Sequence, residues 1–240
     1  KSDDDIYLFM IQRYGDFVLY KQDIVSISER SLGSGFEILL RMKNKDGDLI
    51  GPDQFLSVAD RYNKSIEIDR WVVQSTLAWF DYNLSCLEGV AFFAINLSAK
   101  SLGNKEFERF IVDAVLASQV PSRKICFEIT ETAAIDNIAR VQEFMNAIKA
   151  IGCTFALDDF GTEHSSYSYI KHLPSDKIKI DGSFVSGMLN DPLDFAAVKS
   201  ICEISKAANQ IVVAEFVENE ALVMELKALG VDYAQGYYFS

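Results

Sequence analysis

The sequence contains no uninterrupted apolar run approaching the ~20 residues that a membrane-spanning helix needs. Its charged start, Lys1 to Asp5, is unlike a signal peptide. Basic residues are also scarce, with 23 Lys and Arg against 35 Asp and Glu, a net charge of −12. This balance excludes general binding to long nucleic acids, which needs many cations to displace counterions from phosphates. We expect a cytoplasmic domain, with attachment to a longer, membrane-anchored protein left open.

Cysteine is sparse as well, and no CxxC pair occurs. Each of the four cysteines has apolar residues nearby, which predicts free core thiols in a reducing compartment rather than disulfides or a zinc site. The four positions are Cys86, Cys126, Cys153 and Cys202.

What the chain does contain is a mixture of apolar and charged residues, 49% and 24% of its 240 residues, that suits a large soluble core. Short β-branched or apolar runs alternate with stretches of helical periodicity, the pattern of repeated βα units around a parallel sheet. Eight strands are predicted, at residues 17–24, 36–42, 90–97, 124–129, 154–157, 177–180, 211–214 and 233–236.

Helices are predicted where apolar residues recur at spacings of three and four, as in residues 107–115 and 138–148. Gly152 and Gly230 follow periodic stretches and are expected to end helices. Residues 28–35 are too few for a helical crossover, so the first two strands should pair antiparallel. The predicted fold is a modified TIM-type (β/α)8 barrel of the α/β class with its first strand antiparallel to the others. The predicted boundaries are an N-terminal edge or linker at residues 1–15 and one barrel domain at residues 16–240.

Polar side chains gather at one end of this predicted barrel. Carboxyl ends of barrel strands hold active sites, and carboxylates flanked by apolar neighbours must be paired or bind a cation. Oxygen ligands favour Mg²⁺ or Mn²⁺ over zinc, and neither His164 nor His172 has a suitably spaced soft donor. An adjacent pair of aspartates suits two ions ~3.5–4 Å apart. The alternative is a set of unrelated polar residues bonded to loop backbone. The residues are Glu37, Asn96, Glu128, Asp158, Asp159 and Glu215.

Seven short motifs carry a resemblance to a known family. They are EILLRM (37–42), NLS (96–98), EITET (128–132), DDFGT (158–162), KID (179–181), AEFVE (214–218) and QGYYFS (235–240). In this order and spacing, from about residue 22 to the end, the chain resembles the EAL phosphodiesterase family.

The resemblance implies a role for each matching position. Lys179 and Glu215 would position and deprotonate the attacking water. Leu39, Arg41 and Gln235 would bind substrate, with Gln235 also joining the network of metals and water. Two Mg²⁺ or Mn²⁺ ions would be held by Glu37, Asn96, Glu128, Asp158 and Asp159.

The same resemblance implies a substrate and partners. Cyclic di-GMP would be hydrolysed to linear pGpG, which lowers the level of this bacterial second messenger, and Glu131 would brace the loop that begins at Asp158. A homodimer and fusion to upstream sensor or GGDEF-type domains are also implied. Two alternatives stay open: a catalytically impaired EAL domain that acts as a cyclic di-GMP receptor, and a different metal-dependent barrel hydrolase.

The chain departs from the family pattern at several points. Ile38 replaces the alanine of the EAL motif, Asp23 replaces a proline, and Glu163 and Phe216 replace two glycines. Glycine permits positive φ and close backbone approach, so the last two replacements are expected to stiffen or displace active-site loops. The family also continues through a proline into a final helix, which we expect to be missing here.

Glu163 gives a first test of these departures. If its carboxylate impedes the loop, Glu163→Gly should raise the turnover rate of cyclic di-GMP, because glycine removes a negative charge and frees the backbone. Chromatography of the product over time would measure this rate, and an unchanged rate would show that the carboxylate is tolerated.

Overall fold

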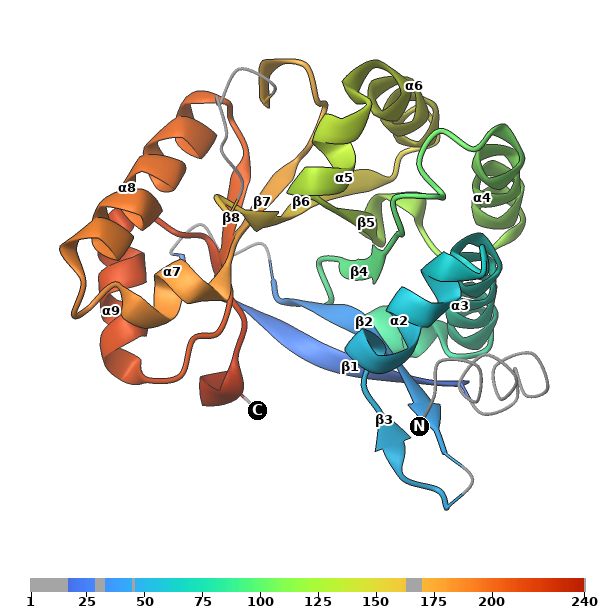
Figure 1. Ribbon diagram of the computed structural model, residues 1–240, viewed down its shortest axis with the longest axis horizontal. Coiled ribbons are helices and arrows are strands. Elements are labelled where there is room, and N and C mark those ends of the chain that lie inside the picture. Colours follow the sequence, from blue (N-terminus) through green and yellow to red (C-terminus); the bar gives the residue numbers. More distant parts are fainter. Residues whose placement is uncertain (1–16, 29–32, 45, 163–169, 240) are drawn as a thin grey trace.

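The computed structural model describes residues 17–28, 33–44, 46–162 and 170–239. Its strands form one continuous sheet (Figure 1). They are β1 (Phe17–Ser26), β2 (Gly35–Lys43), β3 (Leu49–Ile50), β4 (Phe93–Asn96), β5 (Ile125–Thr130), β6 (Thr154–Phe160), β7 (Lys177–Ile180), β8 (Ile211–Ala214) and β9 (Tyr233–Ala234).

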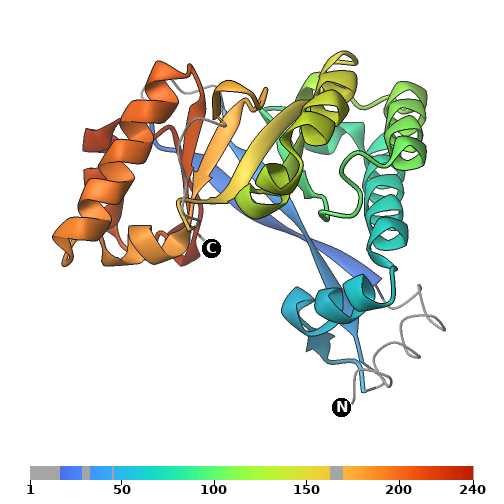
Figure 2. The same cartoon turned by 45° about the horizontal axis from the view of Figure 1, so that its top comes forward.

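Helices surround this sheet, and the long ribbon of β1 and β2 projects from it toward α2 and β3 (Figure 2). They are α2 (Pro52–Arg61), α3 (Ser65–Tyr82), α4 (Lys105–Ala117), α5 (Glu131–Asp136), α6 (Ile138–Lys149), α7 (Gly182–Gly187), α8 (Pro192–Ala207) and α9 (Glu220–Leu229). Single 3₁₀ turns cover Leu84–Leu87, Ser122–Lys124 and Tyr237–Phe239. In the described part of the chain, no helix is long and apolar enough to cross a membrane.

The sheet closes on itself through β1. This strand pairs antiparallel with β2 on one side and β9 on the other. The successive pairs from β2–β4 to β8–β9 are parallel, and the short β3 pairs antiparallel with β2. Every predicted strand is present, so the predicted barrel with an antiparallel first strand is confirmed. Several details differ: β3 was not predicted, β1 and β6 run two and three residues beyond their predicted ends, and the strands predicted at residues 90–97 and 233–236 are shorter, at 93–96 and 233–234.

The barrel interior is built in two layers, because side chains of a strand alternate between its two faces. The lower layer is mostly apolar, and its small members Ala94, Cys126, Ala156 and Val213 pack with the larger Ile24, Phe92 and Tyr233. Two residues further along the same strands come the polar side chains of the upper layer. Outward-facing residues such as Phe127 pack instead in the larger core between barrel wall and helices.

One lysine lies in the lower layer. Lys177 is buried, with its Nζ 4.5 Å from the centre of the Phe92 ring and 3.3 Å from the Thr154 hydroxyl. Its Nζ also lies 3.7 Å from the Cys126 sulfur. Lys177 is two residues before Lys179 and therefore points into the barrel like it.

The helix ends follow ordinary capping chemistry. The side chains of Asn104 and Asn219 accept backbone hydrogen bonds at the starts of α4 and α9. Gly152 and Gly230 have φ values of 98° and 83°, which confirms both predicted helix ends. The cysteine prediction is partly wrong. Three thiols are free and buried, but Cys86 is exposed in the 3₁₀ turn after α3.

Gly230 tests the positive-φ requirement in isolation. A Cβ added there would meet nothing within 4 Å, so Gly230→Ala should lower the free energy of unfolding by about 1 kcal/mol through backbone strain alone. Urea unfolding would measure this difference. Gly51→Ala is the matched control, since its surroundings are equally open but its φ is −71°, and it should change stability by less than about 0.5 kcal/mol. Equal effects of the two substitutions would contradict the prediction.

Candidate active site

The upper layer is centred on the ammonium group of Lys179, a side chain only 1% exposed. Its Nζ lies 2.9 Å from an oxygen of Glu128 and 2.9 Å from one of Glu215. Asp158 and Glu37 complete the ring at 3.1 and 3.4 Å. Four carboxylates from four strands or strand ends therefore share one buried cation, as charges in a barrel interior must.

Strand register explains why these residues meet. In the parallel pairs, Asn96 lies opposite Glu128, and Glu37 lies beside Ala94, two residues before Asn96. Lys179 lies opposite Val213, two residues before Glu215. The structure thus brings together predicted site residues that are up to 198 positions apart in the chain, as in the contact between Glu37 and Gln235.

Two amides tie Glu37 to its neighbours. Asn96 donates from Nδ2 to Glu37 at 2.6 Å, which leaves its Oδ1 for another partner. Gln235 donates from Nε2 to Glu37 at 2.7 Å and to Gln22 at 2.9 Å. The buried Oε1 of Gln235 has no hydrogen-bond partner among the described residues. Buried polar atoms are normally hydrogen-bonded, so this oxygen is an acceptor available to a ligand of the site.

A bulge in β6 changes the directions of the Asp158 and Asp159 side chains. The register shifts between Leu157 and Phe160, and Asp159 has a φ of 54°, so the two carboxylates do not simply alternate across the strand. Oxygens of Asp158, Asp159 and Glu215 all lie within 4.8 Å of one another. Oxygen ligands at such spacing, with an excess of negative charge, suit a hard divalent cation.

The charges shift the pKa values of the site in both directions. Burial raises the pKa of Glu215 to about 7, although Lys179 acts in the opposite direction. Burial also raises the pKa of Glu128 well above its ordinary value, and burial together with Asp158 raises that of Asp159. Burial would raise the pKa of Glu37 too, but Lys179 and the two amides hold it below its ordinary value. Without cations, part of this cluster therefore holds protons near neutral pH.

Other residues singled out in the sequence lie around this ring. Glu131 is fully buried and accepts a hydrogen bond from the backbone N–H of Gly161, 2.9 Å away, in the loop after β6. Leu39 and Arg41 lie further along β2 and are half-buried. The Arg41 guanidinium donates to the carbonyl of its neighbour Leu40 at 2.8 Å. The functional roles assigned to these three residues stay predictions.

A cavity of about 180 Å³ opens beside the ring and is lined by Gln22, Glu37, Glu215, Phe216, Gln235, Gly236 and Tyr237. Phe216 has a φ of 53°, where glycine is favoured, and its exposed ring lies against Gly182. A Cβ on Gly182 would come within 2.1 Å of this ring. Glu163, the other replaced glycine, lies outside the described residues.

Gln22 was missed in the sequence as a site residue. It lies opposite Glu37 in the antiparallel β1–β2 pair and contacts Gln235. The signal was present, because alternation along the strand places Gln22 on the same face as Ile24, which lies in the barrel interior.

These features define the chain as a modified (β/α)8 barrel with an acidic, cation-compatible site at the carboxyl end of its strands. The sequence profile of the EAL domain matches residues 9–240. The chain belongs to the EAL domain family, as its motifs predict.

Curated relatives agree. The chain is 36% identical over 239 residues to the cyclic di-GMP phosphodiesterase PdeA of Borreliella burgdorferi, covering 99% of this chain and 35% of the relative. It is 39% identical over 201 residues to the cyclic di-GMP phosphodiesterase PdeF of Escherichia coli, covering 84% of this chain and 27% of the relative. The chain thus spans about a third or less of the length of these relatives.

Solved structures give the same result. The PaMucR phosphodiesterase in complex with c-di-GMP matches with a TM-score of 0.90 at 28% identity, over 98% of this chain and 96% of that one. An EAL domain protein from Listeria monocytogenes matches with a TM-score of 0.86 at 27% identity, over 100% and 93%.

The raised pKa of Glu215 predicts a pH dependence of stability. A carboxylate whose folded-state pKa lies above its unfolded value stabilises the protein at low pH, and this contribution is lost as pH rises through the folded-state value. With metals chelated, the free energy of unfolding should fall between about pH 4.5 and 7, by on the order of 3 kcal/mol from this group.

Urea unfolding in EDTA at pH 5, 6, 7 and 8 would measure this trend for the parent and for Glu215→Gln, which should show a shallower decline. Glu203→Gln, an exposed change on α8, is the control and should follow the parent. Parallel curves for Glu215→Gln and the parent would contradict the assignment.

Proposed function

We propose that this domain hydrolyses cyclic di-GMP to linear pGpG and so lowers the level of the second messenger. The observation that carries the proposal is the ring of four buried carboxylates around the Lys179 ammonium, beside a cavity at the active end of the barrel. Family membership supports the substrate, because relatives at 36% and 39% identity are cyclic di-GMP phosphodiesterases by name.

Two Mg²⁺ or Mn²⁺ ions fit the site better than zinc. The donor set consists of carboxylate and amide oxygens, and the buried Gln235 Oε1, which has no hydrogen-bond partner among the described residues, is a further acceptor. When bound, such ions neutralise phosphodiester charge and lower the pKa of water. The residues proposed to hold them are Glu37, Asn96, Glu128, Asp158 and Asp159.

The chain's own groups supply the remaining chemistry. Glu215 would accept a proton from the attacking water, since a carboxylate held at the end of β8 beside the reacting centre can act as a general base. Lys179 would donate from Nζ to a phosphoryl oxygen as negative charge builds up there. The water oxygen bonds to phosphorus, the bond from phosphorus to the leaving ribose oxygen breaks, and that oxygen takes up a proton.

Three further residues would act on the dinucleotide or its surroundings. Arg41 would bind a phosphate, since only its Nη1 donates to the Leu40 carbonyl and the guanidinium carries further N–H donors. Leu39 would contact the substrate from the same face of β2. Glu131 would hold the loop after β6 through its bond to Gly161.

A second function has one specific feature in its favour. Phe216 holds a positive φ beside Glu215, and an aromatic residue there constrains a site where glycine would move freely. A cyclic di-GMP receptor that binds without turnover would tolerate this constraint. The retained acidic residues favour catalysis over this alternative.

Assembly and domain context follow from the resemblance alone. A homodimer, fusion to sensor or GGDEF-type domains, and the boundary between residues 1–15 and 16–240 all stay proposals. The length of the relatives, of which this chain covers 35% or less, agrees with additional domains in such proteins.

The test incubates purified protein with cyclic di-GMP and Mn²⁺ or Mg²⁺ and separates pGpG by chromatography. Glu37→Ala and Lys179→Met should lower the turnover rate by about 10²-fold or more, because each removes charge from the reacting centre. Lys177→Met is the matched control, a buried lysine two residues earlier in the same strand that does not reach the ring, and it should retain turnover.

The other outcomes separate the alternatives. Tight binding of cyclic di-GMP without pGpG in either metal would support the receptor and contradict hydrolysis. Absence of binding would contradict both. Equal losses of turnover in Lys177→Met and Lys179→Met would show that Lys179 supports folding rather than the reaction itself.

A further inference from the structure

A buried carboxylate outside the ring lies on α3, near its amino-terminal end. Asp69 is 7% exposed, and a single oxygen, Oδ2, accepts three hydrogen bonds. They come from the backbone N–H of Ser98 at 2.8 Å, the Ser98 hydroxyl at 2.7 Å and the Ser101 hydroxyl at 2.6 Å. Both serines belong to the segment that follows β4.

Burying this charge is costly, since burial raises the pKa of Asp69 in spite of its three donors. Charged acceptors form stronger hydrogen bonds than neutral ones, so the carboxylate holds the segment more firmly than a neutral side chain would. No described residue of opposite charge offsets the free-energy cost of burying the Asp69 carboxylate. The hydrogen bonds that the carboxylate accepts all come from the turn after β4.

The held segment begins two residues after Asn96. The backbone N–H of Leu97 donates to the Glu128 carbonyl at 2.9 Å, and the Asn96 side chain donates to Glu37 at 2.6 Å. These bonds leave the amide oxygen of Asn96 as its unused acceptor. Its direction depends on the backbone that leads into the turn, and Asp69 holds that turn.

Two other contacts fix the same segment from either side. Lys100 lies 3.0 Å from the Asn63 side-chain oxygen and 3.2 Å from Asp60, at the corner between α2 and α3. Arg140 of α6 donates to the Gly103 carbonyl at 2.8 Å. Contacts at three positions of this turn restrict the orientation of Asn96, the residue that precedes it.

We propose that Asp69 is a positioning residue that fixes the amide oxygen of Asn96 for metal binding, an inference that rests on the proposed function. Groups behind a metal ligand commonly change metal affinity by about 10–100-fold when they are removed. Asp69 reaches the ligand through Ser98 rather than directly, so we expect the lower end of this range.

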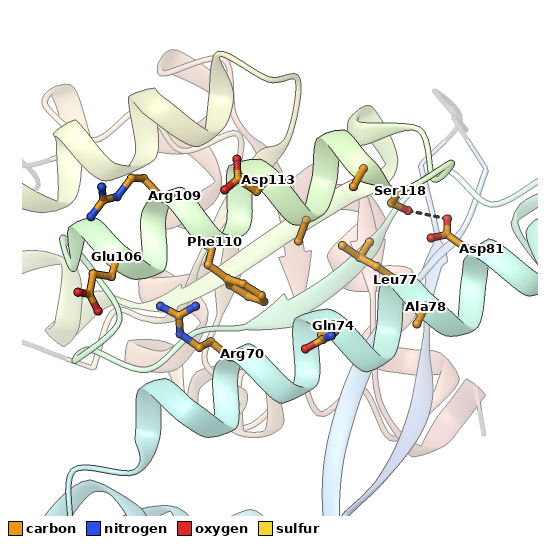
Figure 3. A pocket seen from close by; sticks show the side chains of 12 residues that line it. Arg70, Gln74, Leu77, Ala78, Asp81, Glu106, Arg109, Phe110, Asp113 and Ser118 are labelled. Atoms are coloured by element: carbon orange, nitrogen blue, oxygen red, sulfur yellow. Dashed lines mark hydrogen bonds between the residues drawn. The ribbon is translucent and has the colours of Figure 1, made fainter.

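The other end of α3 offers a matched control. Asp81 accepts a hydrogen bond from the Ser118 hydroxyl at 2.7 Å (Figure 3). It accepts a second one from the backbone N–H of Gln119 at 2.8 Å. The chemistry resembles that of Asp69, with one aspartate of α3 holding a serine and a backbone N–H. Asp81 holds the end of α4, in the groove between α3 and α4, and no site residue adjoins it.

The experiment titrates MnCl₂ into metal-free protein without substrate and follows binding by calorimetry. Asp69→Asn should raise the Mn²⁺ dissociation constant about 10-fold, whereas Asp81→Asn should leave it within about 2-fold of the parent. Ser98→Ala, which removes one donor and keeps Asp69, should raise it by a smaller factor. This variant also tests the proposal should Asp69→Asn fail to fold.

Kinetics add a readout that a purely structural role would not change. At saturating Mn²⁺, the KM for cyclic di-GMP of Asp69→Asn should equal that of the parent, and kcat should approach the parent value. At low Mn²⁺, kcat should fall about 10-fold, in step with metal occupancy.

Some results would overturn the proposal. The proposal would be wrong if Asp69→Asn and Ser98→Ala left the Mn²⁺ affinity unchanged and lowered the Tm as Asp81→Asn does. Asp69 would then only stabilise the fold. Failure of the parent protein itself to bind Mn²⁺ would instead contradict the proposed function and remove the basis of the inference.

Discussion

One ammonium group inside a barrel holds four carboxylates together. Removing a buried ion's partner leaves an uncompensated charge that costs about 3–5 kcal/mol, so Lys179 and its ring exist as a unit. Apolar residues of similar volume would often stabilise such an interior equally well. The ring is therefore better explained by what it binds than by the stability it contributes, and the shifted pKa values of Glu215 and Glu128 agree with that view.

Strain in the backbone gathers at the same place. The non-glycine residues with positive φ among the described positions are Asn63, Asn209, Asp159 and Phe216. Asparagine tolerates this region well, so the first two are ordinary turns. The other two flank the ring, where Asp159 lies in the bulge of β6 and Phe216 follows Glu215. Such strain persists only where surrounding structure enforces it, and the ring and its hydrogen bonds supply that enforcement.

Much of this arrangement follows from the sequence, because strand alternation is a strong signal. The strands at 177–180 and 211–214 were predicted with their observed bounds, and the inward direction of Lys179 follows from its place in the strand. The extension of β6 was missed because Asp158 and Asp159 read as a loop, while a bulge lets a strand continue through them. Cys86 was predicted to be buried because apolar residues lie near it in the sequence. It is exposed because it lies in the 3₁₀ turn that follows α3.

The role of Asp69 could not be predicted from the sequence. It lies on the buried face of a helix whose other inward residues are mostly apolar, and nothing in the local pattern marks its partner. Ser98 lies 29 positions away in a turn that forms only once β4 and α3 have packed. Contacts that depend on tertiary packing rather than on period or spacing cannot be inferred from a single sequence.

The two-layer interior also determines how the site communicates with solvent. Ala94, Cys126, Ala156, Val213 and the buried Lys177 lie in the barrel beneath the charged ring, so in the described part of the chain side chains fill the axis on that side. Whatever reaches Lys179 must arrive and depart by the same opening. Under the proposed function, the linear product leaves through the mouth that the next cyclic dinucleotide needs, so slow release would make the product a competitor of its own precursor.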